Sequence, residues 1–254
     1  MFQAPALTDP VAVFGQWIHH VLGFRLTVLY DGGDRTQMLL GIVTTIKLSI
    51  VTIFFSLVIG LLGAWLQSSR LPFLRRLLEG YVSLFRNTPP LVQMYFFYFA
   101  LSPLLPKIAE NGVAHPLLDN FFWAAFSLSF FAGAFNIEIF RSGLEAVPRT
   151  TVEAAESLGY SRLQSYVQIV LPLAFRISLP ALTNNLVNLV KTTSLAYAIA
   201  VPEMLYVANQ IWSDEANVPE MMVLILLEYV TLVAILVGVL QRLERKMRIP
   251  GYSI

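Results

Sequence analysis

The chain alternates between long apolar runs and shorter polar segments. Five apolar runs fall at about 38–66, 77–101, 121–140, 171–200 and 221–240. A helix needs about 20 mostly apolar residues to cross the hydrocarbon core of a bilayer, and each run supplies that length. Such a helix satisfies its own backbone polar groups in lipid. The pattern therefore predicts an all-α membrane protein with about five transmembrane helices.

The second apolar run contains a polar interruption, Arg86-Asn87-Thr88-Pro89-Pro90. Two adjacent prolines remove two backbone donors and must kink or break a helix. Irregular backbone at membrane depth is tolerated only where it lies against protein or beside a water-filled cavity. This run is therefore expected to line the interior of the protein.

The segments at the two ends of the chain are less informative. Residues 1–36 are expected to form an extracytoplasmic or interfacial segment, and they lack the pattern of a cleaved signal peptide. Aromatic residues within 11–21 favour a short helix at the headgroup level, and a poorly ordered terminus is the alternative. Residues 31–34 are expected to form a turn, and residues 249–254 a tail.

Composition excludes several classes of function. Hydrophobic residues make up 56% of the 254 residues, charged residues 13%, and the mean hydropathy is +0.66. A net charge of +1 gives no basis for nucleic-acid binding. Cysteine is absent and the three histidines form no metal constellation, so no disulfide or metal site is expected. No catalytic motif of recognised spacing occurs, so the chain is not expected to be an enzyme.

Lysine and arginine are unevenly distributed among the polar segments. The 67–80 and 141–165 segments carry three arginines each, and the C-terminal tail carries four basic residues. The 102–120 segment carries only Lys107, and the 201–219 segment carries no lysine or arginine. Positively charged segments remain on the cytoplasmic side of a membrane. The distribution therefore predicts an N-terminus outside and a C-terminus inside.

The most informative polar segment lies between the third and fourth apolar runs. It reads Glu153-Ala154-Ala155, three residues, Gly159, nine residues, Ile169, one residue, and Leu171-Pro172. The residues before Gly159 favour a short helix, and glycine is typical of a helix end or a tight turn. An apolar stripe is expected along Ala154, Ala155, Leu158, Leu163 and Val167. An ordinary amphipathic loop helix is the alternative to a docking element.

This spacing is similar to the EAA signature of ATP-binding-cassette (ABC) importer permeases, and all seven fixed positions match. Phe85-Arg86-Asn87-Thr88-Pro89 and Glu138-Ile139-Phe140-Arg141-Ser142-Gly143 resemble two elements of polar-amino-acid uptake permeases. From about residue 36 to 248, the chain resembles the histidine/glutamine-type permeases of the ABC importer superfamily. It departs from their pattern at Asn87, Pro90, Thr192 and Glu228.

The resemblance implies a type I ABC importer permease fold over 37–248, with a cytoplasmic coupling region at 149–172, in a bacterial cytoplasmic (inner) membrane. It implies two ABC ATPase subunits, a second permease subunit that is similar or identical, and an extracytoplasmic substrate-binding protein. The chain has no phosphate-binding loop, so the ATPase partners would bind ATP with Mg²⁺, and the chain itself would hold no cofactor. The substrate would be a polar amino acid or a close derivative.

The resemblance also assigns the ATPase contact to Glu153, Ala154, Ala155 and Gly159. The two small alanines would allow a close approach to the ATPase. Glu153 would pair with basic ATPase residues or cap the N-terminus of the helix. Gly159 would permit the turn back toward the fourth apolar run.

Polar residues within the apolar runs are candidates for the substrate pathway, because a charge at the bilayer centre costs about 2.5–3.5 kcal/mol. Asn184, Asn188 and Lys191 are spaced to lie on one helix face, with Lys191 suited to a substrate carboxylate. Glu138 suits a substrate ammonium group or a basic side chain. Glu228 suits a cationic substrate, an ion pair with Lys191, or a place near the outer interface. Structural pairing among these polar groups is the alternative to a substrate contact.

A secondary transporter or channel without an ATPase is the alternative function. Many such transporters contain paired broken helices in inverted repeats, and no such repeat is visible in this sequence. The importer permease is therefore the favoured interpretation.

Overall fold

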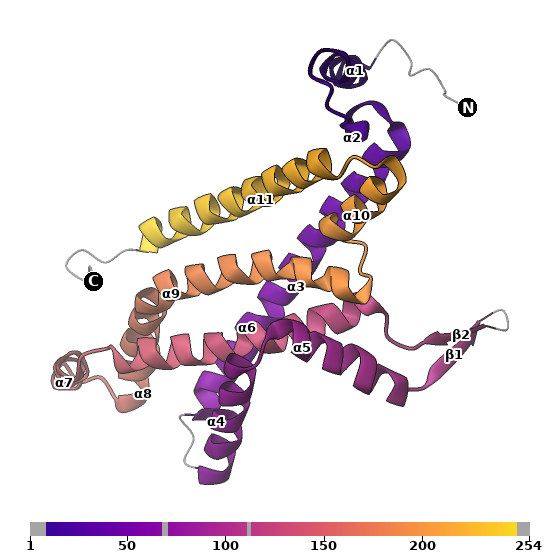
Figure 1. Ribbon diagram of the computed structural model, residues 1–254. Coiled ribbons are helices and arrows are strands. Elements are labelled where there is room, and N and C mark those ends of the chain that lie inside the picture. The colour runs from indigo at the N-terminus through magenta and orange to yellow at the C-terminus, as the bar shows by residue number, and fades with distance from the viewer. Residues whose placement is uncertain (1–8, 68–70, 111–112, 248–254) are drawn as a thin grey trace.

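The computed structural model describes residues 9–67, 71–110 and 113–247. Four helical stretches in this part of the chain are long and apolar enough to cross a membrane. They are α3(Gly32–Gln67), α6(Asn120–Glu145), Arg162–Ile199 and α11(Val218–Met247). The third stretch consists of α8(Arg162–Ser165), the π-helical turn η3(Tyr166–Val170), α9(Leu171–Thr192) and the 3-10 turn η4(Thr193–Ile199). In Figure 1, α6 and α9 run side by side, α3 crosses behind them, and α11 packs along α9.

Small residues allow α3 and α6 to approach closely. A Cβ atom added at Gly60 would lie 2.4 Å from the Cβ atom of Asn136, and one added at Gly63 would lie 2.2 Å from Cδ1 of Ile137. Helices in lipid gain little from the hydrophobic effect, so their association depends on this kind of close packing. The two glycines therefore determine how near α3 lies to α6.

A buried hydrogen-bond network joins α3, α6 and α9. Asn136 is fully buried, donates from Nδ2 to Oγ of Ser56 at 3.2 Å, and accepts from Nδ2 of Asn185 at 2.8 Å. Asn185 also donates to the carbonyl of Ala132 at 3.2 Å. A buried amide without partners would cost about 1–3 kcal/mol, so these bonds fix the three helices relative to one another.

The second apolar run is divided into several elements. They are α4(Pro72–Asn87), α5(Pro90–Tyr95), the π-helical turn η1(Phe96–Leu101) and the 3-10 turn η2(Ser102–Leu104). The predicted break is confirmed, because Thr88 and Pro89 have extended backbones with ψ angles of 143° and 133°. The expectation of one span over 77–101 is wrong, since the prolines end α4 at Asn87 and start a new helix.

One side chain supplies the donor that Pro89 lacks. Nε2 of Gln93 donates to the carbonyl of Phe85 at 2.9 Å, and to the carbonyl and Oγ1 of Thr88 at 3.1 and 2.6 Å. In an unbroken helix the residue at position 89 would donate to the Phe85 carbonyl, but proline has no N–H. Gln93 is only 8% exposed, so water does not substitute for its amide.

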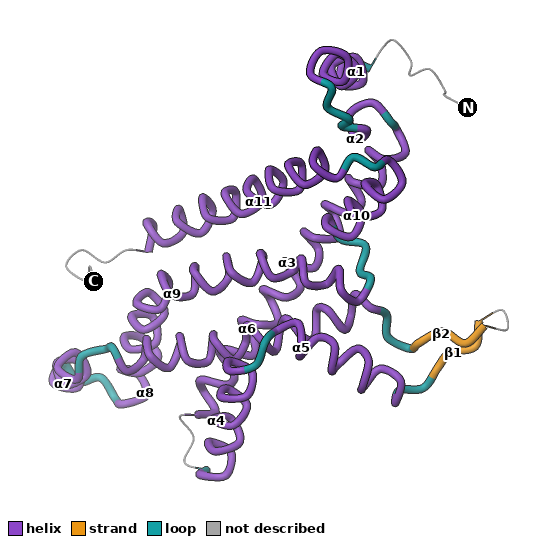
Figure 2. The backbone as a smooth tube through the Cα atoms, in the orientation of Figure 1, coloured by secondary structure: helices purple, strands orange, loops and turns teal. Residues whose placement is uncertain are grey.

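Two segments that were expected to be loops contain regular structure. The 102–120 segment includes an antiparallel hairpin of β1(Lys107–Glu110) and β2(Val113–Pro116), drawn in orange in Figure 2. The 201–219 segment includes α10(Met204–Glu215). The Glu203 carboxylate caps α10 by accepting from the N–H groups of Leu205 and Tyr206 at 3.0 and 2.9 Å. Outside the short hairpin, the described elements are helical, as predicted.

The N-terminal segment is helical and is fastened to α3. It contains α1(Pro10–Leu22) and α2(Thr27–Tyr30), so the predicted helix at 11–21 is confirmed. An ion pair joins Arg35 to Asp9, and the hydrogen bond from Arg35 holds the pKa of the Asp9 carboxyl below its ordinary value. Residues 1–8 and the tail at 249–254 lie outside the described residues.

The boundary between the N-terminal segment and α3 differs from the expectation. The predicted turn at 31–34 is wrong, because α3 already begins at Gly32. Asp31 caps it, since its Oδ1 accepts from the N–H groups of Gly33 and Asp34 at 2.8 and 3.0 Å. An aspartate that precedes a helix satisfies amides of the first turn in this way.

Replacing Gln93 by leucine keeps most of the side-chain volume and removes the amide donor. We expect Gln93→Leu to lower the free energy of unfolding by about 1–3 kcal/mol, because the Phe85 and Thr88 carbonyls lose their donor. Thermal unfolding of the purified protein in detergent measures this as a lower midpoint. Gln210→Leu, at an exposed position of α10, is the control and should leave the midpoint unchanged. Equal midpoints for both variants would contradict the role given to Gln93.

Candidate functional site

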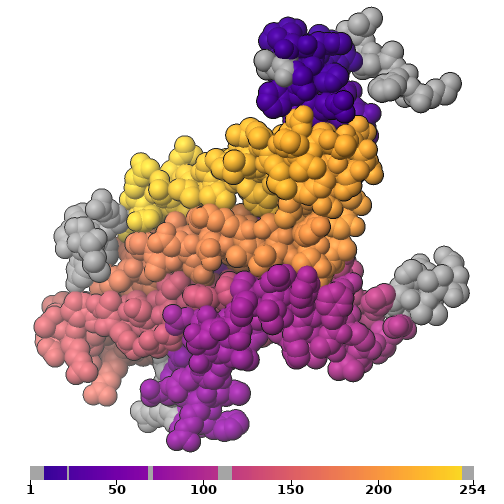
Figure 3. All heavy atoms as spheres, viewed as in Figure 1, coloured from indigo at the N-terminus to yellow at the C-terminus, as the bar shows by residue number. Residues whose placement is uncertain are grey.

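A short polar helix, α7(Arg149–Ser157), projects beyond the ends of α6 and α9 (Figure 1). In the space-filling view it lies with α8 at the left edge of the molecule (Figure 3). Pro148 precedes α7 with an extended backbone, and Gly159 follows it with a φ angle of 89°. The left-handed conformation costs other residues about 1–2 kcal/mol, and glycine avoids this cost. The turn expected at Gly159 is confirmed.

Local packing holds both ends of α7. Val147, which precedes it, forms a buried cluster with Val170 and Ala174, and Val152 of α7 packs against this cluster. After the turn, Ser161 caps α8, which continues through η3 into α9. The short helix is therefore attached to α6 at one end and to α9 at the other. A displacement of α7 is transmitted to both spans.

The four residues predicted for coupling do not share one face. Glu153 and Ala154 are exposed, whereas Ala155 is 3% exposed and packs against its own chain. Ala154 therefore faces outward, whereas Ala155 faces its own chain, and the expected close approach of the two alanines to the ATPase stays a prediction. The capping role suggested for Glu153 is wrong, because Pro148 occupies the N-cap and Glu153 lies within the helix.

Three apolar side chains that follow α7, in the turn, in α8 and in η3, are exposed. Leu158 is 80% exposed, Leu163 72% and Val167 51%. The predicted apolar stripe is thus present at these three positions, and Ala155 is excluded from its exposed surface. These three side chains lie within 158–167, and apolar surface that gathers in one place marks an interaction site more often than scattered single residues do.

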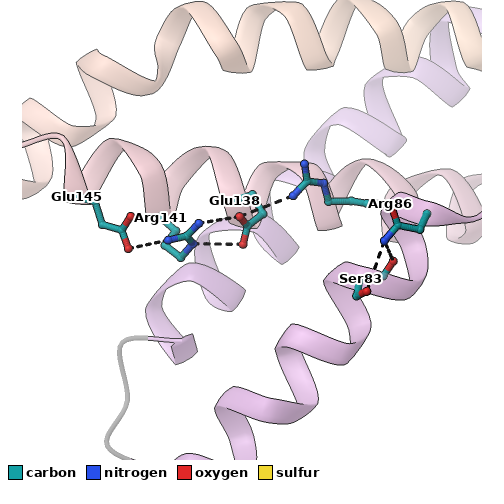
Figure 4. Close-up of polar contacts among 6 residues, drawn as sticks. Ser83, Arg86, Glu138, Arg141 and Glu145 are labelled. Carbon is teal, nitrogen blue, oxygen red and sulfur yellow. Dashed lines mark hydrogen bonds and ion pairs between the residues drawn. The ribbon is translucent and has the colours of Figure 1, made fainter.

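Glu138 belongs to a charged cluster between α4 and α6 (Figure 4). Arg141 donates to Glu138 from Nε at 3.2 Å and from Nη2 at 2.8 Å, and it donates from Nη1 to Glu145 at 2.6 Å. Arg86 of α4 approaches Glu138 with Nη1 3.7 Å from Oε2. Its guanidinium also lies over the ring of Phe135, 5.2 Å from the centroid. Glu138 was predicted to pair with a substrate ammonium group or with a basic side chain. In the structure its partners are the basic side chains of Arg141 and Arg86.

A cavity of about 420 Å³ lies beside this cluster. Its polar lining comes from Gln67, Arg75, Glu79, Glu138, Arg141 and Glu145. Arg86 and Arg141 were not predicted to be site residues. A signal was present, because charges of opposite sign spaced three and four residues apart meet on one helix face.

The polar stripe of α9 is exposed. Asn184, Asn188 and Lys191 all lie on the surface of the chain, whereas Asn185 is the residue that pairs with α6. The alternative that polar groups of the spans pair with one another therefore holds for Asn185. Among the described residues it does not hold for the stripe of Asn184, Asn188 and Lys191. Glu228 of α11 is partly buried, and its Oε2 has no hydrogen-bond partner among the described residues. The suggested pairing of Glu228 with Lys191 is not found there.

Known proteins share this arrangement. Residues 56–249 match the family described as binding-protein-dependent transport system inner membrane component. The chain belongs to this family. The permease is 32% identical over 214 residues to the glutamate/aspartate import permease protein GltJ of Escherichia coli (strain K12), covering 83% of this chain and 87% of that protein. It is 31% identical over 177 residues to the nopaline transport system permease protein NocM of Agrobacterium fabrum (strain C58 / ATCC 33970), covering 70% and 73%.

Two solved structures have the same fold. A crystal structure of an amino acid ABC transporter with histidines has a TM-score of 0.76 at 23% identity, covering 88% of this chain and 100% of that chain. An inward-facing structure of the MetNI methionine ABC transporter has a TM-score of 0.66 at 18% identity, covering 86% and 100%. The predicted type I importer fold and the predicted class, an ABC importer permease subunit, are confirmed. Nothing supports the secondary transporter or channel.

The conformation of Gly159 can be tested apart from side-chain packing. A Cβ atom at Gly159 or at Gly80 would meet no atom within 4 Å, but only Gly159 has a positive φ angle. We expect Gly159→Ala to destabilise the end of α7 by about 1–2 kcal/mol, which makes its amide hydrogen exchange roughly tenfold faster. Gly80→Ala, within α4, is the control and should not accelerate exchange. Unchanged exchange across α7 in Gly159→Ala would show that alanine adopts this turn at no cost, and would contradict the prediction.

Proposed function

We propose that this permease forms half of the translocation pathway of an ATP-driven importer of polar amino acids or close derivatives, and that α7 docks a cytoplasmic ATPase. The observation that carries the proposal is the construction of α7. It projects from the bundle, is attached to α6 and α9, and is followed by the exposed Leu158 at its C-terminal end and by the exposed Leu163 in α8. A rigid helix with an apolar tip suits insertion into a cleft of a partner protein.

ATP with Mg²⁺ is bound and hydrolysed by two ATPase subunits, because this chain has no phosphate-binding loop. Closure of the two ATPases moves α7 as a rigid body. Because α7 continues into α6 on one side and α8 and α9 on the other, its movement reorients two spans at once. This movement alternates the pathway between its two sides.

The pathway forms between this chain and a second permease subunit, similar or identical, and an extracytoplasmic binding protein delivers the substrate. The exposed stripe of Asn184, Asn188 and Lys191 supplies the polar lining. Lys191 provides a cation for a substrate carboxylate, and the asparagines provide donors and acceptors. Glu228 adds an acid in the neighbouring helix α11, which suits a substrate with a positive group.

The names of the relatives support this substrate class. GltJ is described as an import permease for glutamate and aspartate, and NocM as part of a nopaline transport system. These solutes share an amino-acid core with additional polar groups. A lining that combines a lysine with asparagines fits that shared chemistry.

Two leucines of similar exposure test the docking site. Leu158 at the end of α7 is 80% exposed, and Leu104 beside the hairpin, at the other end of the molecule, is 78% exposed (Figure 1). We expect Leu158→Arg to reduce co-purification of the ATPase at least tenfold, because a charge would be buried in an apolar contact. Leu104→Arg is the matched control and should retain the ATPase. If only Leu104→Arg lost the ATPase, the ATPase would bind at the end of the molecule opposite α7, and the proposal would be wrong.

The orientation proposed here places α7 and the C-terminus in the cytoplasm and the N-terminus outside. Arg149 and Arg162 lie on α7 and α8, and Arg75 of α4 lines the same cavity as Arg141 and Glu145 at the end of α6 that leads to α7. Positively charged segments remain on the cytoplasmic side. The same orientation directs α10 and α1 to the outside.

The absence of cysteine makes the orientation measurable with single cysteines. Ser157 of α7 and Ser213 of α10 are both exposed, and each donates to the carbonyl four residues before it. We expect a membrane-impermeant maleimide to label Ser213→Cys in intact spheroplasts and to label Ser157→Cys only in inverted vesicles. The reverse pattern would overturn the proposed orientation.

A further inference from the structure

We infer that the contact between Arg86 and Glu138 transmits the movement of α7 to the break between α4 and α5. Arg86 and Glu138 are then positioning residues of the transport cycle. The inference rests on the proposed function, because it takes α7 as the helix that the ATPase moves. It adds the route by which that movement reaches a second element of the bundle.

The first half of the route lies within α6. Glu138, Arg141 and Glu145 occupy the last turns of this helix, and only 146–148 separate its end from α7. Helix hydrogen bonds make these turns rigid along the axis. When α7 is displaced, the carboxylate of Glu138 moves with it.

The second half of the route lies at the end of α4. Tyr81 donates to the carbonyl of Phe130, and Phe85 packs against the ring of Phe130 with centroids 6.0 Å apart, so α4 rests on α6. Arg86 follows directly and makes the ion pair that joins α4 to α6 in the described part of the chain. The next turn is the proline break. Arg86 is therefore the charged contact of α4 nearest to the point where the helix direction changes.

The break is suited to absorb a movement. Pro89 and Pro90 have no N–H to donate, and the amide of Gln93 donates to the Phe85 carbonyl in place of Pro89 and also to the Thr88 carbonyl. Sharp changes of helix direction occur at such prolines. A shift of Arg86 therefore changes the angle between α4 and α5 before it distorts either helix.

The geometry of the contact between Arg86 and Glu138 suits an ion pair that forms and separates during the transport cycle. The Arg86 side chain is 42% exposed and the Glu138 side chain 25%, and partly exposed ion pairs at 3.7 Å contribute little to stability. Glu138 keeps two hydrogen bonds from Arg141 when Arg86 leaves. Separation therefore leaves no carboxylate without a partner. For the same reason, variants at Arg86 are expected to fold.

The experiment uses the complete importer, with its ATPase and binding protein, reconstituted in vesicles. Substrate uptake and ATP hydrolysis are measured together, and their ratio reports coupling. We expect Arg86→Gln to lower the ratio at least fivefold while ATP hydrolysis stays within twofold of the wild type. Arg86→Lys, which keeps the charge, should recover at least half of the ratio. The double variant Arg86→Gln/Glu138→Gln should lower the ratio no further than the more impaired of the two single variants does, because the two residues act through one contact.

The control is Arg76→Gln, which makes the same chemical change on α4. Arg76 is exposed and is not among the residues that line the cavity beside Glu138, so this variant should leave the ratio unchanged. A normal ratio in Arg86→Gln, or no recovery in Arg86→Lys, would overturn the inference. Failure of the proposed function is a different result, since the wild-type complex would then show no ATP-dependent uptake.

Discussion

The close contact between α3 and α6 is the constraint on which the rest of the bundle depends. Gly60 and Gly63 leave no room for a side chain, and Asn136 uses this proximity to reach Ser56. The same asparagine accepts a hydrogen bond from Asn185, which places α9 against the pair. Steric fit and hydrogen bonding thus fix three spans in one arrangement. The ends of α6 and α9, and therefore α7, take their positions from it.

A fixed arrangement of α6 and α9 gives the coupling helix a mechanical use. A helix that hung from a flexible loop would move without moving the spans. Here Val152 packs on the cluster of Val147, Val170 and Ala174, so the short helix and the span ends form one unit.

Much of the fold was predictable because hydrophobicity and proline chemistry act locally. Four long spans and the break at Pro89 follow from the sequence alone, and Gly159 marks the turn after α7. The helix α10 and the hairpin were missed, because the prolines in or beside these segments and their polar residues favour loops, and tertiary contacts decide their structure. Burial of Ala155 was missed for a similar reason, since periodicity does not tell which side of a short helix faces its own chain. The pairing of Arg86 with Glu138 joins residues that are far apart in sequence, so no local pattern indicates it.

The length of α3 has a consequence for the surrounding lipid. Its 36 residues span about 54 Å at 1.5 Å per residue, and the hydrocarbon core is about 30 Å thick. The helix must therefore tilt or extend past the acyl chains, as is usual under hydrophobic mismatch. Its N-terminal end carries α1, seen end-on in Figure 1, with Phe14 and Trp17 exposed. Aromatic rings such as these two favour the headgroup level of a bilayer, so the overhang of α3 beyond the acyl chains would be shared with the rings that α1 exposes.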